Sequence, residues 1–292
     1  MRRPIRPHFL LKAGDLRLSL GKQTKIMGVL NLTPDSFSGD GLYKNRGSKK
    51  ALTLARKLIR EGADILDIGG ESTRPGAEKI SAKEEITRIK PTVIALVKEG
   101  VPISVDTYKT DVAKWALDAG VNMINNVKAT TASKSFLRMV RNYNAAIVLM
   151  HMRGRPKTMQ KKIVYKNVLR EIIAELRKPL ENCLEIGIKS DRIIIDPGIG
   201  FGKTLHHNLE ILACLSEFQI LNQPILVGTS RKSFIGLILN KEPGGRLNGT
   251  VASVCAAILN GAHIVRAHDV KAVKEAAMVT DSITAQHNLY HS

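Results

Sequence analysis

The sequence predicts an α/β protein, a (β/α)8 TIM barrel. Apolar runs recur along the chain at 26–30, 63–66, 101–105, 121–124, 146–150, 193–195, 224–228 and 262–265. Their continuous Val, Ile and Leu content is typical of parallel strands buried on both faces. Stretches with helical spacing of apolar residues separate the runs, so strands and helices alternate. Eight such units in 292 residues, with no domain break, favour a closed barrel over the alternative, an open doubly wound sheet.

Nearly every apolar run ends in a polar or charged residue. These residues are Asn31, Asp67, Asp106, Asn125, His151, Asp196, Ser230 and Arg266. The carboxyl ends of barrel strands meet at one mouth, and barrel enzymes carry their active sites there. The sequence therefore predicts a ring of functional side chains at that mouth.

The remaining elements follow from turn signals and spacing. Residues 1–25 are expected to form an N-terminal extension, with a hairpin around Gly14 and Asp15 at the bottom of the barrel, and residues 26–292 the barrel itself. Helices are expected from near residue 48 and over 82–98, 111–119, 133–141, 164–186, 208–215, 247–260 and 270–286. The loops 31–41 and 69–77 exceed the usual length of a strand-to-helix connection, so both are candidates for function.

The composition argues against several classes of protein. No run approaches the roughly 20 apolar residues of a membrane span, and no signal-peptide core follows the basic N-terminus. Cys183, Cys214 and Cys255 have neither metal-ligand spacing nor the even number of a disulfide framework, which indicates a reducing compartment. The net charge of +19 is spread over many predicted helices without interleaved aromatic residues. This pattern favours a solvated basic surface over a nucleic-acid site.

Two strand-end carboxylates predict a site for a heterocycle rich in N–H donors. Asp196 precedes a glycine-rich turn that contains Phe201, and Asp106 ends the third run. A carboxylate can accept two parallel N–H bonds from an amidine-like edge, and Asn125 adds an amide. Alternatively, each carboxylate caps the helix that follows it. The glycine-rich turn also suggests a phosphate site, although its spacing is not that of a nucleotide-binding P-loop.

Basic residues after the last two strands predict an anion site. Residues 230–233 read Ser-Arg-Lys-Ser, and Arg266 and His268 follow the eighth run. This quadrant of a barrel often binds phosphate, and Thr73 and Arg74 in the second long loop could reach the same anion. The alternative is a set of unrelated surface charges.

One strand-end amide and one histidine are weaker candidates. Asn31 could offer an oxygen to Mg²⁺, which binds few protein groups together with phosphate oxygens and water. His151 has no second histidine at metal-ligand spacing, so it is left without a role.

Taken in order, these motifs resemble the dihydropteroate synthase family of pterin-binding barrels over residues 25–286. The resemblance rests on Asn31-Leu32-Thr33-Pro34-Asp35-Ser36-Phe37, Asp67-Ile68-Gly69-Gly70-Glu71-Ser72-Thr73-Arg74-Pro75-Gly76, Ser104-Val105-Asp106-Thr107, Met150-His151-Met152, Asp196-Pro197-Gly198, Ser230-Arg231-Lys232-Ser233 and Arg266-Ala267-His268-Asp269. Several ordered motifs are far more specific than any one of them.

The resemblance implies condensation of 6-hydroxymethyl-7,8-dihydropterin pyrophosphate with 4-aminobenzoate, assisted by Mg²⁺. The positions implied to hold the pterin are Asp106, Asn125, Asp196 and Lys232. Those implied to bind pyrophosphate are Thr73, Arg74, Arg266 and His268, with Asn31 at its metal. Those implied to border the aminobenzoate pocket are Pro75, Phe201 and Ser233.

The expected mechanism is dissociative, because an electron-rich dihydropterin can delocalise the cation left when the C–O bond breaks. No general base of tuned pKa is then required, and the enzyme must mainly stabilise the leaving pyrophosphate. The two long loops would close over the cation and exclude water. The residues expected to be catalytic are Arg266, His268, Lys232 and Asp106.

Three departures from the family pattern keep other functions open. Asn126 stands where the family has Asp, and residues 127–130 and 38–41 also differ. A pterin-binding paralogue without synthase activity is therefore one alternative. A methyltetrahydrofolate-dependent methyltransferase is another, although it has no pyrophosphate for the basic cluster to bind. The resemblance further implies a homodimer that acts on small molecules. The cysteines indicate a cytoplasmic location, the lack of a long apolar run argues against a membrane partner, and the spread of charge disfavours nucleic acid.

Overall fold

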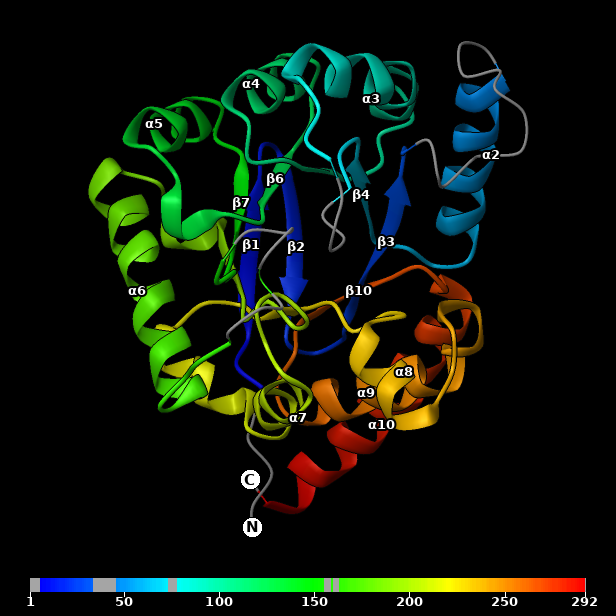
Figure 1. Cartoon of the computed structure of the whole chain (residues 1–292), viewed down its shortest axis with the longest axis vertical. Helices are drawn as coiled ribbons and strands as arrows, with labels where there is room; N and C mark the ends of the chain where they lie inside the picture. The colour runs from blue at the N-terminus through cyan, green and yellow to red at the C-terminus, as the bar shows by residue number, and fades with distance from the viewer. Residues whose placement is uncertain (1–5, 34–45, 73–77, 155–158, 160–162, 292) are drawn as a thin grey trace.

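The computed structural model describes residues 6–33, 46–72, 78–154, 159 and 163–291. Eight parallel strands form a barrel with helices around it (Figure 1). The strands are β3 (Lys25–Asn31), β4 (Ile65–Gly69), β5 (Ile103–Asp106), β6 (Met123–Asn126), β7 (Ala146–Met150), β8 (Ile193–Asp196), β9 (Leu226–Val227) and β10 (Ile264–Ala267). The predicted fold class is confirmed.

The strand order shows how the ring closes. Hydrogen-bonded neighbours run β8-β7-β6-β5-β4-β3-β10-β9, and every pair is parallel. The ring closes between β8 and the residues just before β9. There Ile195 and Ile225 form a β-bridge, and the Ile195 N–H donates to Pro224 O at 3.0 Å. The strand predicted over 224–228 is shorter in the structure, in part because Pro224 has no N–H to donate.

Helices follow most of the strands and pack outside them. They are α2 (Arg46–Arg60), α3 (Ala82–Val97), α4 (Thr110–Asp118), α5 (Lys134–Asn142), α6 (Val168–Ile186), α7 (Leu205–Ala213), α8 (Ser233–Leu239), α9 (Leu247–Leu259) and α10 (Val270–His291), with 3₁₀ turns η1 (Ala129–Thr131), η2 (Ser190–Arg192), η3 (Leu215–Leu221) and η4 (Pro243–Gly245). None of the helices in the described part of the chain is both long and apolar enough to cross a membrane.

Capping side chains explain two wrong helix boundaries. The helix predicted from residue 164 begins at Val168, because the side chain of Asn167 accepts the N–H of Arg170. The helix predicted from residue 208 begins earlier, because Thr204 accepts the N–H of His207 in a capping box. Helix α8 was not predicted at all.

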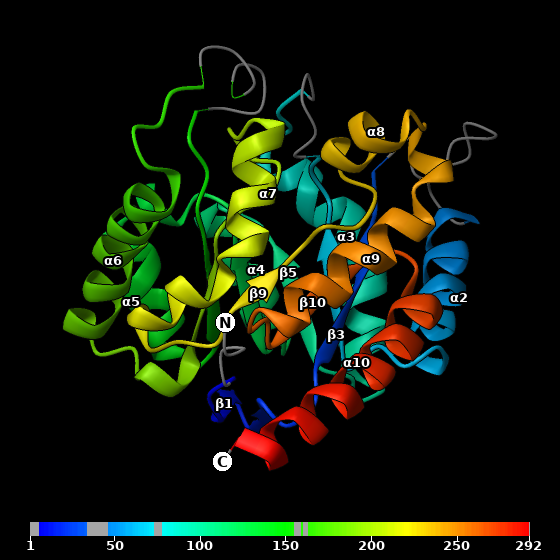
Figure 2. The ribbon, with the colours of Figure 1, turned by 90° about the horizontal axis from the view of Figure 1, so that it is seen from below.

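The N-terminal hairpin closes one end of the barrel. Strands β1 (Phe9–Ala13) and β2 (Leu16–Leu20) pair antiparallel, as expected around Gly14 and Asp15. Leu11 and Leu20 are buried against inward-facing residues of the strands. Figure 2 shows β1 toward one end of the molecule and α7 and α8 toward the other. The mouth at the strand carboxyl ends is therefore the end left for a site.

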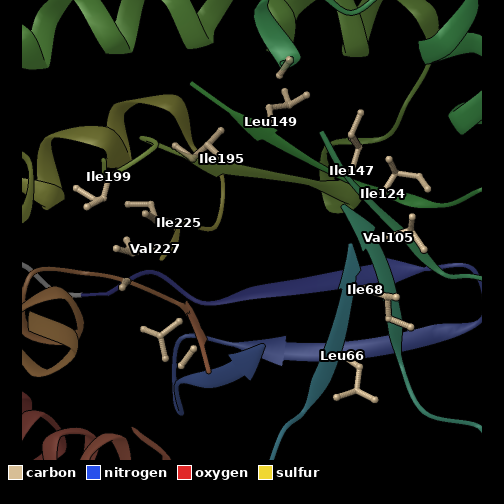
Figure 3. Close-up of a cluster of buried hydrophobic side chains, with 14 of the residues drawn as sticks. Leu66, Ile68, Val105, Ile124, Ile147, Leu149, Ile195, Ile199, Ile225 and Val227 are labelled. Carbon is tan, nitrogen blue, oxygen red and sulfur yellow. The ribbon is translucent and has the colours of Figure 1, made fainter. Parts of the chain in front are cut away.

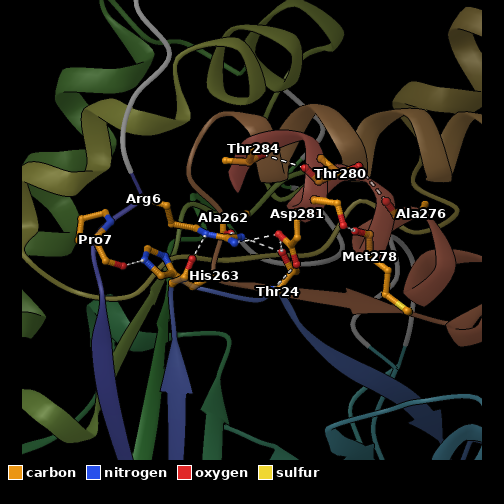
Figure 4. A network of polar contacts seen from close by, with 12 residues as sticks. Arg6, Pro7, Thr24, Ala262, His263, Ala276, Met278, Thr280, Asp281 and Thr284 are labelled. Carbon is orange, nitrogen blue, oxygen red and sulfur yellow. Dashed lines mark hydrogen bonds and ion pairs between the residues drawn. The ribbon is translucent and has the colours of Figure 1, made fainter. Parts of the chain in front are cut away.

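A buried arginine ties the segment before the hairpin to α10. Arg6 donates to Thr24 Oγ1 at 2.7 Å, Ala262 O at 2.9 Å and Asp281 Oδ1 at 2.8 Å (Figure 4). His263 contacts the Pro7 carbonyl oxygen at 3.0 Å in the same region. Because its side chain is buried and fully bonded, Arg6 anchors the extension to the barrel rather than to a ligand.

Successive side chains along each strand point alternately outward to the helices and inward to the barrel interior, which gives two sets. One set packs outside, toward the helices, and includes Ile68, Val105, Ile124, Ile147 and Ile195 (Figure 3). The other faces the barrel interior and contacts the hairpin; it includes Ile65, Met123, Ile194 and Ile264. Residues two positions further along a strand face the same way. The next interior layer therefore contains Asp67, Asn125, Asp196 and Arg266.

Candidate active site

Asp67 is the centre of the polar layer above the interior core. Its side chain is fully buried and receives the Arg266 Nε–H at 2.6 Å and the Asn125 Nδ2–H at 3.1 Å, both on Oδ2. Arg266 also donates through Nη2 to Asp106 Oδ2 at 3.2 Å. The structure thus joins Arg266, Asp106 and Asn125, three predicted site residues, through one carboxylate to which the sequence analysis gave no role.

Several acceptors in this layer remain available. Asp67 Oδ1 and Asn125 Oδ1 are buried and find no hydrogen-bond partner among the described residues. Buried acceptors are normally satisfied, because leaving one unpaired costs about 1–3 kcal/mol. These oxygens are therefore suited to a ligand that brings N–H donors.

Burial raises the pKa of two strand-end carboxyls, and a like charge adds to the shift at one of them. Burial, with the neighbouring charge of Asp67, raises the pKa of Asp106 to about 7, although Arg266 opposes the shift. Burial raises the pKa of Asp196 to about 6, against the 2.7 Å bond from Gly198 N to Oδ1 and the charge of Lys232. Both groups are poised to change protonation near neutral pH, where small changes in their surroundings decide the charge.

The alternative that these two carboxylates cap helices is wrong. The residue before α4 is Lys109, and the cap of α7 is the Thr204 side chain. Asp196 instead receives the N–H of Gly198 within its own turn. Neither Asp106 nor Asp196 is thus the N-cap of the helix that follows it.

Lys232 and Phe201 meet at the mouth. Lys232 Nζ lies 3.9 Å from the centre of the Phe201 ring, within cation–π range. Desolvation and the charge of Arg266 lower the pKa of Lys232 to about 8, while Asp196 and Asp106 counteract the shift. Four side chains therefore influence one another's charge at the mouth: Lys232, Arg266, Asp106 and Asp196.

His268 is held as a neutral ring beside Ser230. Its backbone N–H donates to Ser230 Oγ at 3.1 Å, and Nδ1 lies 3.0 Å from the same oxygen. Burial and the charge of Arg266 lower the pKa of His268 to about 3. His268 can therefore offer a ligand one hydrogen bond but not a positive charge at neutral pH. Arg231, by contrast, is paired with Asp269 at 2.6 Å and 3.0 Å.

The glycines after Asp196 permit close backbone packing. Gly198 and Gly202 have φ of 71° and 66°, and a Cβ would lie 1.9 Å from His151 O at the first and 2.2 Å from Arg153 O at the second. Only glycine fits such positions. The glycine-rich sequence is thus explained by contact with the end of β7, without a phosphate site.

The strand end at Asn31 faces the same mouth as Asp106. A Cβ added at Gly69 would lie 3.5 Å from Asn31 Oδ1 and 3.7 Å from Asp106 Cβ. Among the described residues, no group of three or more His, Cys, Asp or Glu side chains could hold a metal ion. Asn31 Oδ1 is one amide oxygen at this strand end, a ligand type that a hard cation accepts.

The barrel matches known proteins along most of its length. A family model described as pterin binding enzyme matches residues 27–268. The dihydropteroate synthase of Synechocystis sp. is 42% identical over 275 residues, which span 94% of each chain. The chain belongs to the dihydropteroate synthase family.

Solved structures of the family superpose closely on the chain. The dihydropteroate synthase of Clostridium difficile in the presence of pteroic acid is 41% identical, with a TM-score of 0.85, and the match covers 90% of this chain and 98% of that one. The Xanthomonas albilineans enzyme with 4-aminobenzoic acid is 37% identical, with a TM-score of 0.87 and coverage of 96% and 99%. The family resemblance read from the sequence is confirmed.

Some residues assigned from the dihydropteroate synthase motifs lie apart from the cluster or outside the structure's description. Thr73, Arg74 and Pro75 are outside the described residues. Ser233 begins α8 with an exposed side chain. Their predicted roles at pyrophosphate and aminobenzoate stay predictions.

Asn126, at the position where the family motif has aspartate, holds a local turn. It is buried, and its Oδ1 accepts the Lys128 N–H at 2.9 Å. An amide oxygen can accept this bond as a carboxylate oxygen can, but the amide is neutral. The end of β6 therefore carries no charge at Asn126.

Sequence analysis missed the roles of Asp67 and Lys203. Asp67 lies in a motif quoted above, and Lys203 follows the glycine-rich turn. Only the fold shows that Asp67 joins three site residues and that Lys203 is buried beside His151. The available signal was position in the sequence: Asp67 directly follows an apolar run, as Asp106 and Asp196 do, and Lys203 follows the glycine-rich turn.

Proposed function

We propose that this chain condenses 6-hydroxymethyl-7,8-dihydropterin pyrophosphate with 4-aminobenzoate to give 7,8-dihydropteroate and pyrophosphate, a step of folate biosynthesis. The observation that carries the proposal is the interior polar layer, in which Asp67, Asp106, Asn125 and Arg266 are bonded together at the strand ends. The names of the family members, and the pteroic acid and 4-aminobenzoic acid present in two of their structures, agree with it.

The pterin is assigned to the carboxylate side of the mouth. Ionised Asp196 can accept two N–H bonds from the amidine-like edge of the ring. Asp106 and the free Oδ1 of Asn125 supply further acceptors for the remaining donors. Lys232 interacts electrostatically with both carboxylates and supplies an N–H donor for a ring acceptor.

The pyrophosphate is assigned to the basic side of the mouth. Arg266 uses Nε and Nη2 on carboxylates, and a guanidinium has five N–H donors, so donors remain for an anion. His268 adds an N–H from a neutral ring held by Ser230. Fixed donors of this kind stabilise charge as it develops on a leaving group.

The reaction is proposed to be dissociative. The C–O bond to pyrophosphate breaks first, the pair of electrons leaves with the pyrophosphate, and the amine of 4-aminobenzoate then forms the C–N bond and releases a proton. Mg²⁺, with Asn31 as its protein oxygen, would neutralise charge on the pyrophosphate. No protein group has to act as a strong base, which suits a mouth whose acids titrate near neutrality.

The aminobenzoate is assigned to the Phe201 side of the mouth. The aromatic face of Phe201 offers a flat wall for a benzene ring, and Lys232 lies over that face. Ser233 and Pro75 are proposed at its border, following the family motifs.

The assembly is proposed to be a cytoplasmic homodimer. Leu237 and Ile238 of α8 are 69% and 54% exposed, which is unusual for large apolar side chains and favours burial in a second copy. The three cysteines are free thiols, as expected in a reducing compartment. Sedimentation of wild-type and Leu237→Lys protein tests the dimer.

Mass detection of dihydropteroate tests the proposed reaction. The protein is incubated with the pterin pyrophosphate and Mg²⁺, with and without 4-aminobenzoate. Dihydropteroate that appears only with aminobenzoate supports the proposal. Binding of the pterin without any product would instead identify a paralogue that has lost the synthase activity.

A further inference from the structure

Lys203, His151 and Glu175 form a hydrogen-bonded chain next to the loop that carries Phe201. No step of the proposed reaction uses these residues. Lys203 Nζ lies 2.9 Å from His151 Nδ1, and His151 Nε2 lies 2.8 Å from Glu175 Oε2 on α6. Lys203 is 3% exposed and His151 is fully buried. Burying a lysine and a histidine together is costly unless their hydrogen bonds are needed.

The hydrogen bonds run in one direction, because each group donates to the next from Lys203 through His151 to Glu175. When Lys203 donates to Nδ1 of His151, the imidazole proton resides on Nε2 and is donated to the Glu175 carboxylate. Burial lowers the pKa of His151 to about 4, which agrees with a neutral ring. Arg153 in turn pairs with Glu175 and lies over the Tyr165 ring.

The Lys203 ammonium also bonds to the backbone of its own loop. Nζ donates to the Phe201 carbonyl oxygen at 3.1 Å, and a Cβ at Gly198 would lie 3.4 Å from Nζ. The lysine therefore fills the inside of the turn that carries Phe201. Since the Phe201 ring also faces Lys232 at 3.9 Å, fixing its backbone fixes one wall of the mouth.

We propose that Lys203, held by His151 and Glu175, is a positioning residue that sets the orientation of the Phe201 ring and thereby the affinity for the aromatic amine substrate. The proposal rests on the proposed function, because it takes the amine to be an aminobenzoate that binds at Phe201. It predicts a larger effect on that substrate than on the pterin. Lys203 bonds to His151 and to the loop of Phe201, whereas it acts on the pterin residue Asp196 through its charge.

The test compares Michaelis constants for the two substrates in Lys203→Met. The variant keeps the length of the side chain and removes its N–H donors. Losing a buried hydrogen bond is expected to raise the KM for 4-aminobenzoate about tenfold, with the KM for the pterin pyrophosphate within about twofold. Lys49→Met, at an exposed position of α2, is the matched control. Equal increases in both KM values, or a change in neither, would overturn the proposal.

A double-mutant cycle separates positioning from general damage. In a Phe201→Ala background, Lys203→Met should no longer change the aminobenzoate KM, because the ring through which it acts is gone. An undiminished effect in that background would overturn the proposal.

A milder variant keeps the test valid if Lys203→Met does not fold. Glu175→Gln weakens the anchor of His151 from a half-exposed helix position and should raise the aminobenzoate KM about threefold with the pterin KM unchanged. If wild-type protein makes no dihydropteroate, the proposed function fails; if it does and the KM ratios do not move, only the positioning role fails.

Discussion

The Nε–H of Arg266 donates to Oδ2 of Asp67 over 2.6 Å, a buried ion pair that joins β10 to β4 across β3. The same carboxylate oxygen receives Asn125. Asp67 therefore fixes the orientation of one residue assigned to the pyrophosphate and one assigned to the pterin. Fixed donors and acceptors of this kind need no rearrangement when charge develops.

Replacing Asp67 with Asn should shift the pH dependence of turnover. The charge of Asp67 is one cause of the raised pKa of Asp106, so its removal lowers that pKa. If ionised Asp106 is the active form, the acid limb of kcat/KM moves to lower pH. Profiles from pH 5 to 9 for wild type and variant would show this, and an acid limb that stays in place would contradict the coupling.

Replacing Asp196 with Asn should abolish pterin binding. One of the paired acceptors becomes a donor and opposes an N–H of the ring, which costs on the order of 100-fold or more in affinity. Calorimetry with a pterin ligand measures the loss. Asp111→Asn, at an exposed position in the first turn of α4, is the control. Unchanged affinity in the Asp196 variant would remove Asp196 from the pterin site.

The affinity for pterin should fall as the pH falls from about 8 to about 5. The pKa values of Asp106 and Asp196 are raised to about 7 and about 6. Protonation in this window converts an acceptor pair into a group with only one good acceptor, so the bound fraction decreases on the acid side. Calorimetric titrations at several pH values give the profile. A constant affinity would show that other residues hold the ring, and an affinity that rises toward low pH would show that the binding form is the protonated one.

Replacing Arg266 with Ala should reduce both turnover and stability. Turnover should drop about 100-fold or more if Arg266 stabilises the leaving group. Two buried carboxylates also lose their partner, which costs about 3 kcal/mol in the free energy of unfolding. Urea unfolding and steady-state kinetics measure the two effects. Arg56→Ala, which breaks the exposed pair with Glu99, should leave the stability nearly unchanged. A normal rate for Arg266→Ala would place the pyrophosphate elsewhere.

Replacing Asn31 with Ala should raise the Mg²⁺ concentration needed for half-maximal turnover by about tenfold, because the proposed ion loses its protein oxygen. The KM for 4-aminobenzoate serves as the internal control and should not change. Titration of Mg²⁺ at saturating substrate is the measurement. An identical Mg²⁺ dependence in wild type and variant would rule out Asn31 as a ligand.

The barrel was predictable because its strands are buried on both faces. Continuous apolar runs such as 146–150 have no other simple explanation, and the polar residue after each run marks the mouth. The strand predicted over 224–228 proved shorter, in part because Pro224 has no N–H to donate, and the helix α8 escaped prediction because its seven residues are too few for a periodic pattern.

The site was only partly predictable, because a strand-end residue can face inward or outward. Asp67 precedes Ile68, which packs outside against the helices, and follows Leu66, which does the same. Only the register, with Asp67 opposite Val29 and Ser104, shows that its side chain faces the interior beside Arg266. The partners of Lys203 were hidden for a similar reason, since His151 and Glu175 are far from it in the sequence.

The measurement that tests the account most directly follows pyrophosphate and dihydropteroate in the same reaction, for wild type and for Asp196→Asn. The account predicts that wild type makes dihydropteroate only when 4-aminobenzoate is present, with at least one pyrophosphate released for each dihydropteroate, and that the variant loses both products together. Wild-type protein that makes no dihydropteroate, or a variant with the wild-type rate, would contradict a synthase built on the strand-end carboxylates.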